Sequence, residues 1–194
     1  MGFRCRWLAV RGRDRDGVLA RLGFRVVGEL VEEVHDPGLY ALEVDDWLVV
    51  IGDGADHMNG VKRAQAARLA DDGDVVCLVT DDTTMTFELT VFRGGKALWS
   101  VAYDGGDGVT APTLEGEVPF AVRVLLARLE KEQARAGGPK AAVDHIYDLA
   151  PTYAQELVGF RHDVTLGSGE HVPIWQLDAK GPYGQPEVRS GFRN

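Results

Sequence analysis

The sequence predicts an α+β fold in which an antiparallel sheet is covered by C-terminal helices. Apolar residues alternate with polar ones over 85–91 and again over 97–103, which is the period of half-buried strands. Between these runs lies Arg93-Gly94-Gly95-Lys96, whose glycines permit the positive φ angles of a two-residue hairpin turn. After Pro119, apolar residues recur at the i, i+3, i+4 and i+7 spacing of an amphipathic helix. Since a sheet and a helix each expose one apolar face, we expect a meander with its hairpin near 84–103 packed against these helices.

Strand-like and helix-like segments precede the hairpin. Residues 3–9 alternate in the manner of a strand, and Asp14 or Asp16 begins a short helix that ends at Gly23. A second helix is expected over 61–70, because Asp71-Asp72-Gly73 stops it. Further strands are expected at Phe24–Val27, Tyr40–Val44, Trp47–Ile51 and Val75–Thr80.

After the hairpin, Thr113–Glu117 is expected to add a third strand to the meander. The helix that begins after Pro119 ends at Gly137. A second helix is expected to place Val143, Ile146, Tyr147 and Ala150 on one face, to break or restart at Pro151, and to stop at Gly159. We therefore expect a single domain over 1–163, followed by an extended Gly- and Pro-rich tail over 164–194 whose one buried segment is 172–177.

Composition favours a cytoplasmic protein that does not enter membranes. The longest uninterrupted apolar runs, 47–51 and 75–79, are far shorter than the ~20 residues that span a bilayer. The apolar run near the N-terminus is also too short for a signal peptide. Two cysteines, Cys5 and Cys77, do not suggest a disulfide framework, and we expect both to be free thiols.

The net charge of −9 is unevenly distributed along the chain. Residues 1–25 carry seven arginines and two aspartates, whereas residues 26–117 carry 19 acidic and 5 basic residues. An acidic surface repels phosphate backbones, so nucleic acid is not an expected partner. The arginines of residues 1–25 are candidates for binding an anion, but ion pairs with the acidic residues of 26–117 explain them more simply.

Several motifs that bind cofactors are only partly present, and we expect no cofactor. Gly52-Asp53-Gly54 lacks the third glycine of a dinucleotide-binding loop, because His57 stands in its place. Gly94-Gly95-Lys96 lacks the following Ser or Thr of a phosphate-binding loop. The acidic residues near Asp53 do not have the alternate spacing of a calcium loop. No serine lies in a nucleophile-elbow motif, and no histidine lies near either cysteine in the sequence.

One group of residues suggests metal binding or acid–base catalysis. Asp144, His145 and Asp148 lie near a helix start, and His162 and Asp163 follow the helix that ends at Gly159. A helical hairpin would bring the two groups together, and histidine with carboxylates is a suitable ligand set for a metal. The structural alternative is that these residues are solvated, cap a helix or pair with Arg161.

Aromatic residues suggest a second alternative, a small-ligand pocket. Its lining would be Trp7, Trp47, Trp99 and Tyr103. Inward-facing aromatic residues on strands are more commonly part of a hydrophobic core.

Three segments of the chain resemble a family of bacterial proteins to which no activity is assigned. The resemblance covers roughly residues 1–163 and rests on Trp99-Ser100-Val101 with Tyr103-Asp104-Gly105-Gly106, on Val143-Asp144-His145-Ile146-Tyr147-Asp148-Leu149-Ala150-Pro151, and on Leu157-Val158-Gly159-Phe160-Arg161-His162-Asp163. It implies a bacterial, cytoplasmic protein and assigns no catalytic residue.

These observations together favour a non-catalytic acidic module, immunity-like or regulatory, that binds a basic protein. Acidic residues concentrate in predicted turns, where we expect Asp71, Asp72, Asp81 and Asp82 to face solvent and contact the partner. The alternatives are a metal-dependent hydrolase that uses His145, His162 and nearby carboxylates, and a small-ligand-binding protein. The sequence does not indicate an oligomeric state.

Overall fold

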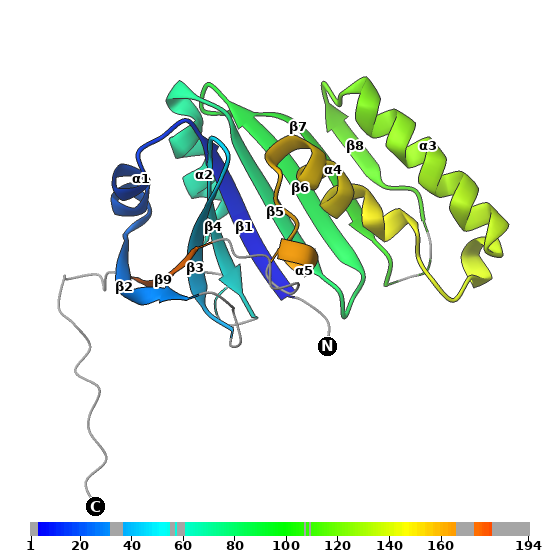
Figure 1. Cartoon of the computed structure of the whole chain (residues 1–194). Coiled ribbons are helices and arrows are strands. Elements are labelled where there is room, and N and C mark those ends of the chain that lie inside the picture. The colour runs from blue at the N-terminus through cyan, green and yellow to red at the C-terminus, as the bar shows by residue number, and fades with distance from the viewer. Residues whose placement is uncertain are drawn as a thin grey trace, which may run out of the picture.

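A computed structural model of the chain describes residues 4–31, 37–54, 57, 61–106, 108, 110–165 and 173–179. It confirms the predicted α+β class, with a nine-stranded antiparallel sheet and helices packed on it (Figure 1). The strand order across the sheet is β2-β9-β3-β4-β1-β5-β6-β7-β8. The strands are β1 (Arg4–Arg11), β2 (Phe24–Val31), β3 (Leu39–Val44), β4 (Trp47–Asp53), β5 (Val75–Asp81), β6 (Thr86–Arg93), β7 (Lys96–Asp104), β8 (Thr113–Gly116) and β9 (Ile174–Ala179).

Strand β1 lies at the centre of the sheet, paired with β4 on one side and β5 on the other. Successive side chains of β1 point to opposite faces of the sheet and so belong to two different cores. Cys5, Trp7 and Ala9 belong to one core, and Leu8 and Val10 belong to the other. A strand that is covered on both faces is apolar along most of its length, which accounts for the buried run from Trp7 to Val10.

The predicted hairpin is formed by β6 and β7, and its turn lies at Gly94 and Gly95, with φ angles of 57° and 72°. The turn before this hairpin corrects the predicted strand start. Met85 was expected to begin the strand, but it adopts a φ of 54° in the β5–β6 turn, and β6 begins at Thr86. Alternation alone does not reveal a left-handed backbone at the end of an apolar pattern.

The segment beyond residue 163 contributes a strand to the sheet. Ile174–Ala179 forms β9, which pairs with β2 on one side and β3 on the other. The expected buried segment at 172–177 overlaps this strand, since Ile174 and Leu177 are both buried. The sheet therefore joins residues near the two ends of the described chain, with Arg25 opposite Asp178.

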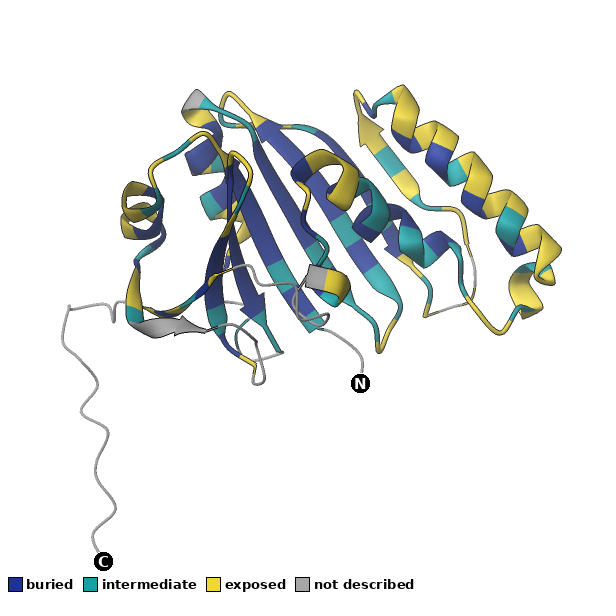
Figure 2. Cartoon of the chain, viewed as in Figure 1, coloured by how far each residue is buried: buried dark blue, intermediate teal, exposed yellow. Residues whose placement is uncertain are grey.

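Helices cover both faces of the sheet, as Figures 1 and 2 show. On the inner face, α3 (Phe120–Arg135) and α4 (Leu149–Val158) bury the first core, as expected for the C-terminal helices. On the outer face, α1 (Arg15–Leu22) and α2 (Arg63–Leu69) bury the second core. A short helix, α5 (His162–Thr165), follows α4.

The expected helix over 143–150 is shorter than the apolar spacing suggests. Val143 lies outside any helix and is exposed, Ile146–Asp148 forms a single 3-10 turn, and α4 begins at Leu149. Pro151 lies in the first turn of α4, where a backbone N–H would have no intrahelical partner. Proline therefore marks the start of this helix and does not interrupt one. Gly159 ends it with a φ of 79°, as predicted.

Candidate functional site

One face of the sheet carries polar side chains on four neighbouring strands. Directly paired residues of antiparallel strands point to the same side of a sheet, so the register defines cross-strand rows. The rows on the side opposite α4 are Asp81–Thr86–Asp104, Val79–Glu88–Ala102–Thr113 and Cys77–Thr90–Ser100–Glu115. We call the surface made by these residues the outer face of β5–β8.

Described helices leave the far half of this outer face uncovered. The second core is built from α1, α2 and strands on the β1 side of the sheet, with Phe92 as its contribution from β6. It contains no residue of β7 or β8 among the described residues. In Figure 1 the helices labelled near β6, β7 and β8 are α3 and α4, which bury the opposite, inner face.

The carboxylates of the outer face divide into two groups. Nearest β1, the Asp81 carboxylate contacts the Arg4 guanidinium at 3.0 Å, and Glu88 forms an ion pair with Arg63. On β7 and β8, Asp104 and Glu115 are exposed and form no ion pair with a described residue. The uncovered half of the face therefore carries negative charge that the described residues do not neutralise.

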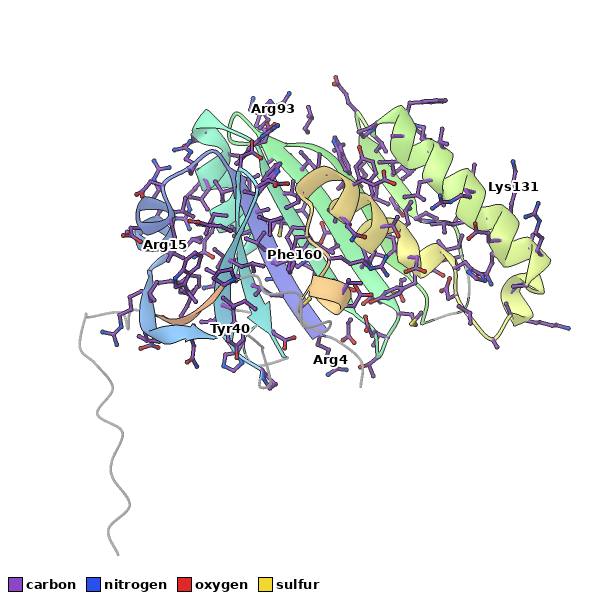
Figure 3. The ribbon with its side chains drawn as sticks, viewed as in Figure 1. Arg4, Arg15, Tyr40, Arg93, Lys131 and Phe160 are labelled. Carbon is purple, nitrogen blue, oxygen red and sulfur yellow. The ribbon has the colours of Figure 1, made fainter. Side chains whose placement is uncertain are left out.

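The acidic residues predicted to contact a partner do not form one patch. Asp71 follows α2 and packs against Gly95 of the β6–β7 turn, near the start of β5, whereas Asp81 and Asp82 lie at its end. Seven residues of strand separate these positions by roughly 20 Å. Arg93, which pairs with Asp74, and Arg4, which pairs with Asp81, mark the two ends of the sheet in Figure 3. The side chain of Asp72 lies outside the described residues.

Asp82 takes part in a polar cluster on the inner face. The Tyr147 hydroxyl donates to Asp82 at 2.5 Å and forms a second hydrogen bond with the buried hydroxyl of Thr80. Burial, followed by the hydrogen bond to Asp82, raises the pKa of Tyr147 above its ordinary value. This phenol stays protonated at neutral pH and joins the segment before α4 to the end of β5.

Asp144 has a comparable structural role. One of its oxygens accepts a 2.6 Å hydrogen bond from the hydroxyl of Tyr103, and the other accepts from the backbone N–H groups of Ile146 and Tyr147. Burial and this carboxylate together raise the pKa of Tyr103. Asp144 thus caps the 3-10 turn before α4 and attaches it to β7.

Arg161 connects the other two carboxylates of the proposed metal site. Its guanidinium donates to Asp148 at 2.8 Å and to Asp163 at 2.7 and 3.0 Å, and it also reaches the hydroxyl of Thr152. Burial is the largest single effect and acts to raise the pKa of the Asp163 carboxyl, but the hydrogen bonds from Arg161 and the charges of His162 and Arg161 together lower it. Asp148 and Asp163 do converge, as the helical hairpin predicted, and the cation between them is Arg161.

The two histidines of that constellation are separated into different environments. The backbone N–H of His145 donates to Gln133 of α3, and its side chain is partly exposed. His162 is buried at the start of α5, and burial lowers its pKa despite the nearby Asp163 and Asp82. Across the described residues, no three His, Cys, Asp or Glu side chains form a group that could hold a metal ion.

The aromatic residues proposed to line a ligand pocket instead fill the first core. Trp7, Trp47, Trp99 and Tyr103 are all buried. Trp7 contacts Phe160 edge to face with ring centroids 5.4 Å apart, and Tyr103 stacks on Phe87. Figure 3 labels Phe160 beside α4, over the middle of the sheet.

Both cysteines are buried and lie on opposite faces of the sheet. Burial raises the pKa of Cys77 to about 12 and that of Cys5 well above its ordinary value. Neither thiol is ionised at neutral pH, so neither has the thiolate character of a catalytic nucleophile.

Sequence reasoning did not identify the outer face of β5–β8, whereas the structural alternative of a pair with Arg161 is confirmed for Asp163. The signal for the outer face was present in the alternation itself. Thr86, Glu88 and Thr90 occupy the positions between the apolar residues of β6, and such polar residues form the second face of the strand. The contact between Arg161 and Asp148 had no local signal, because it joins residues on the two sides of α4 and depends on how that helix packs.

Comparisons with known proteins place no further constraint on the site. Protein-family models, curated proteins and solved structures were all compared with the chain, and none of them matches. The resemblance to a bacterial family therefore stays a prediction. Among the helices of the described chain, none combines the length and apolar character needed to cross a membrane.

Proposed function

We propose that the protein is a non-catalytic binding module that receives a basic protein on the outer face of β5–β8. The observation that carries this proposal is the register of β7 and β8, which places Asp104 and Glu115 on a face that the second core does not cover. Glu88 lies at the margin of that face, where it already pairs with Arg63 of α2. Positively charged side chains of a partner would meet the carboxylates of Asp104 and Glu115 directly.

The small side chains of this face support a broad, flat contact. Between the carboxylates, the rows contain the half-buried Thr86 and Ala102 and the exposed Thr113, whereas Thr90 and Ser100 are buried. Short residues leave a partner free to approach along several strands at once, which suits the extended interfaces of protein complexes. Asp81 lies at the margin of the face, and its ion pair with Arg4 reduces what it contributes to a partner.

The net charge of −9 supports the choice of a basic partner. A negative field speeds the encounter with a cationic protein, and the association rate then falls as salt increases. The polar contacts of Asp82, Asp144, Asp148 and Asp163 are internal, so these residues contribute more to the attachment of α4 than to recognition.

A photo-crosslinking amino acid at Ala102 tests this proposal. Ala102 lies in the middle row of the outer face, and Ala127, exposed on α3, provides a matched control position. In an extract of cells that naturally make the protein, we expect a basic protein to crosslink at position 102 and not at position 127. Mass spectrometry identifies it, and its purified form is then titrated against the chain.

Charge-neutral variants complete the test. D104N and E115Q should each weaken the purified complex, with a smaller loss at high salt, whereas E156Q on α4 should not. A partner that crosslinks equally at both positions, or that binds D104N/E115Q as tightly as the unchanged protein, contradicts the proposal.

A further inference from the structure

A cavity of about 290 Å³ opens between α1 and α2. Its lining residues are Arg21, Leu22, Gln65, Arg68, Leu69 and Asp71. The volume is close to the lower end of the range for small-molecule sites in proteins, roughly 300–1,000 Å³. A ligand here would be compact.

The walls of the cavity are held in place by the second core. Leu22 and Leu69 are buried and supply apolar surface from the two helices. Gln65 joins the helices, because its amide nitrogen donates to the carbonyl of Leu22 at 3.1 Å while its oxygen accepts from the backbone of Lys62 at 2.7 Å. This bridge fixes the spacing between α1 and α2.

Two arginines of this cavity differ from most of the arginines around them. Arg4, Arg11, Arg15 and Arg25 each form an ion pair with an aspartate. Arg21 and Arg68 are exposed, and neither pairs with a carboxylate of the described residues. Two guanidinium groups that share one cavity repel each other, and a bound anion would remove that repulsion.

We propose that the cavity between α1 and α2 binds a small phosphate ester. Guanidinium groups present planar sets of N–H donors that match phosphate oxygens, and two of them can neutralise a phosphate dianion. The apolar walls from Leu22 and Leu69 would contact the carbon skeleton of the ligand. Asp71, which also lines the cavity, would accept a hydrogen bond from a hydroxyl group of the same ligand.

Ribose 5-phosphate is a suitable probe, since it combines a phosphate dianion, a short carbon skeleton and hydroxyl groups. Isothermal titration calorimetry at low ionic strength should detect binding with a dissociation constant of about 1 mM or lower. Ribose tests whether the phosphate is required, and succinate tests whether a dicarboxylate suffices. Circular dichroism confirms that each variant is folded.

We expect R21Q and R68Q each to weaken binding by about tenfold, the effect of losing a hydrogen bond to a charged group. R123Q and R135Q on α3 are matched controls, because these arginines are also exposed and should leave binding unchanged. Absence of binding at about 10 mM ribose 5-phosphate overturns the proposal, since a dissociation constant above that concentration is too weak for a specific ligand site. Equal losses in all four variants, equal binding of ribose, or binding of succinate alone would overturn it as well.

Discussion

The two faces of β5–β8 use carboxylates in opposite ways. On the inner face, Asp82 and Asp144 accept hydrogen bonds from the buried or half-buried hydroxyls of Tyr147 and Tyr103, and these contacts hold the segment before α4 against the sheet. On the outer face, Asp104 and Glu115 project from the same sheet and are exposed. Residues of one chemical type are therefore structural on the inner side and accessible to a partner on the outer side of β7 and β8, which the described helices of the second core do not reach.

Phe160→Ala should produce the largest loss of stability, because Phe160 packs within the inner-face core. Phe160 is fully buried and contacts Trp7 edge to face. Truncation removes the ring and leaves a cavity, so we expect the free energy of unfolding to fall by about 3–5 kcal/mol in urea denaturation. Phe120→Ala is the control, since Phe120 is 81% exposed and should change stability little. Similar losses for both variants would mean that the helical layer is not packed on the sheet.

Tyr147→Phe tests the polar contacts of the inner face without changing its packing. The variant removes the hydroxyl that Thr80 and Asp82 share, and the Thr80 hydroxyl is fully buried. We expect a loss of about 1–3 kcal/mol in the free energy of unfolding, the cost of a buried polar group without its partner. Tyr153→Phe, in which no described hydrogen bond is lost, is the matched variant. An equal loss in the free energy of unfolding for the two variants would contradict the structural role assigned to Asp82.

His162 should make stability depend on pH. Burial lowers its pKa below the ordinary value of 6.5, so the unfolded chain binds the proton more readily than the folded one. Stability is then fully present above pH 6.5 and declines as pH falls through the interval down to the folded-state pKa, by at most about 1.4 kcal/mol per pH unit. His162→Asn should flatten this part of the profile between about pH 7 and pH 5. Parallel profiles for the variant and the unchanged protein would contradict the prediction.

Substitutions on the outer face should have the smallest effect on folding. Glu115→Gln and Asp104→Asn should each change the free energy of unfolding by less than about 0.5 kcal/mol, because neither carboxylate is part of an ion pair with a described residue. Asp144→Asn on the inner face should cost about 1–2 kcal/mol, since this carboxylate accepts from Tyr103 and two backbone N–H groups. Thermal unfolding of the three variants measures the contrast, and a loss on the outer face as large as that of Asp144→Asn would show that this face is structural.

Local patterns in the sequence were sufficient for most individual elements. Alternation predicted β6 and β7, because successive side chains of a strand point to opposite faces, and the glycine pair predicted their turn. The spacing of Val122, Leu125 and Leu129 predicted α3, and these residues are buried. The end of α4 followed from Gly159, since a left-handed residue at the end of a helix favours glycine.

Only the tertiary structure decided how those elements combine. The pairing of β9 with β2 and β3 joins residues about 150 positions apart, as in the ion pair between Arg25 and Asp178, and no local pattern specifies such a partner. The convergence of Asp148 and Asp163 on Arg161 depends on the packing of α4 in the same way. Alternation separates the two faces of each strand, but long-range packing decides which face a helix covers. For that reason the sequence determined that polar side chains line one side of β6 and β7, and the tertiary structure determined that the described helices cover part of that side over β6 and leave it open over β7 and β8.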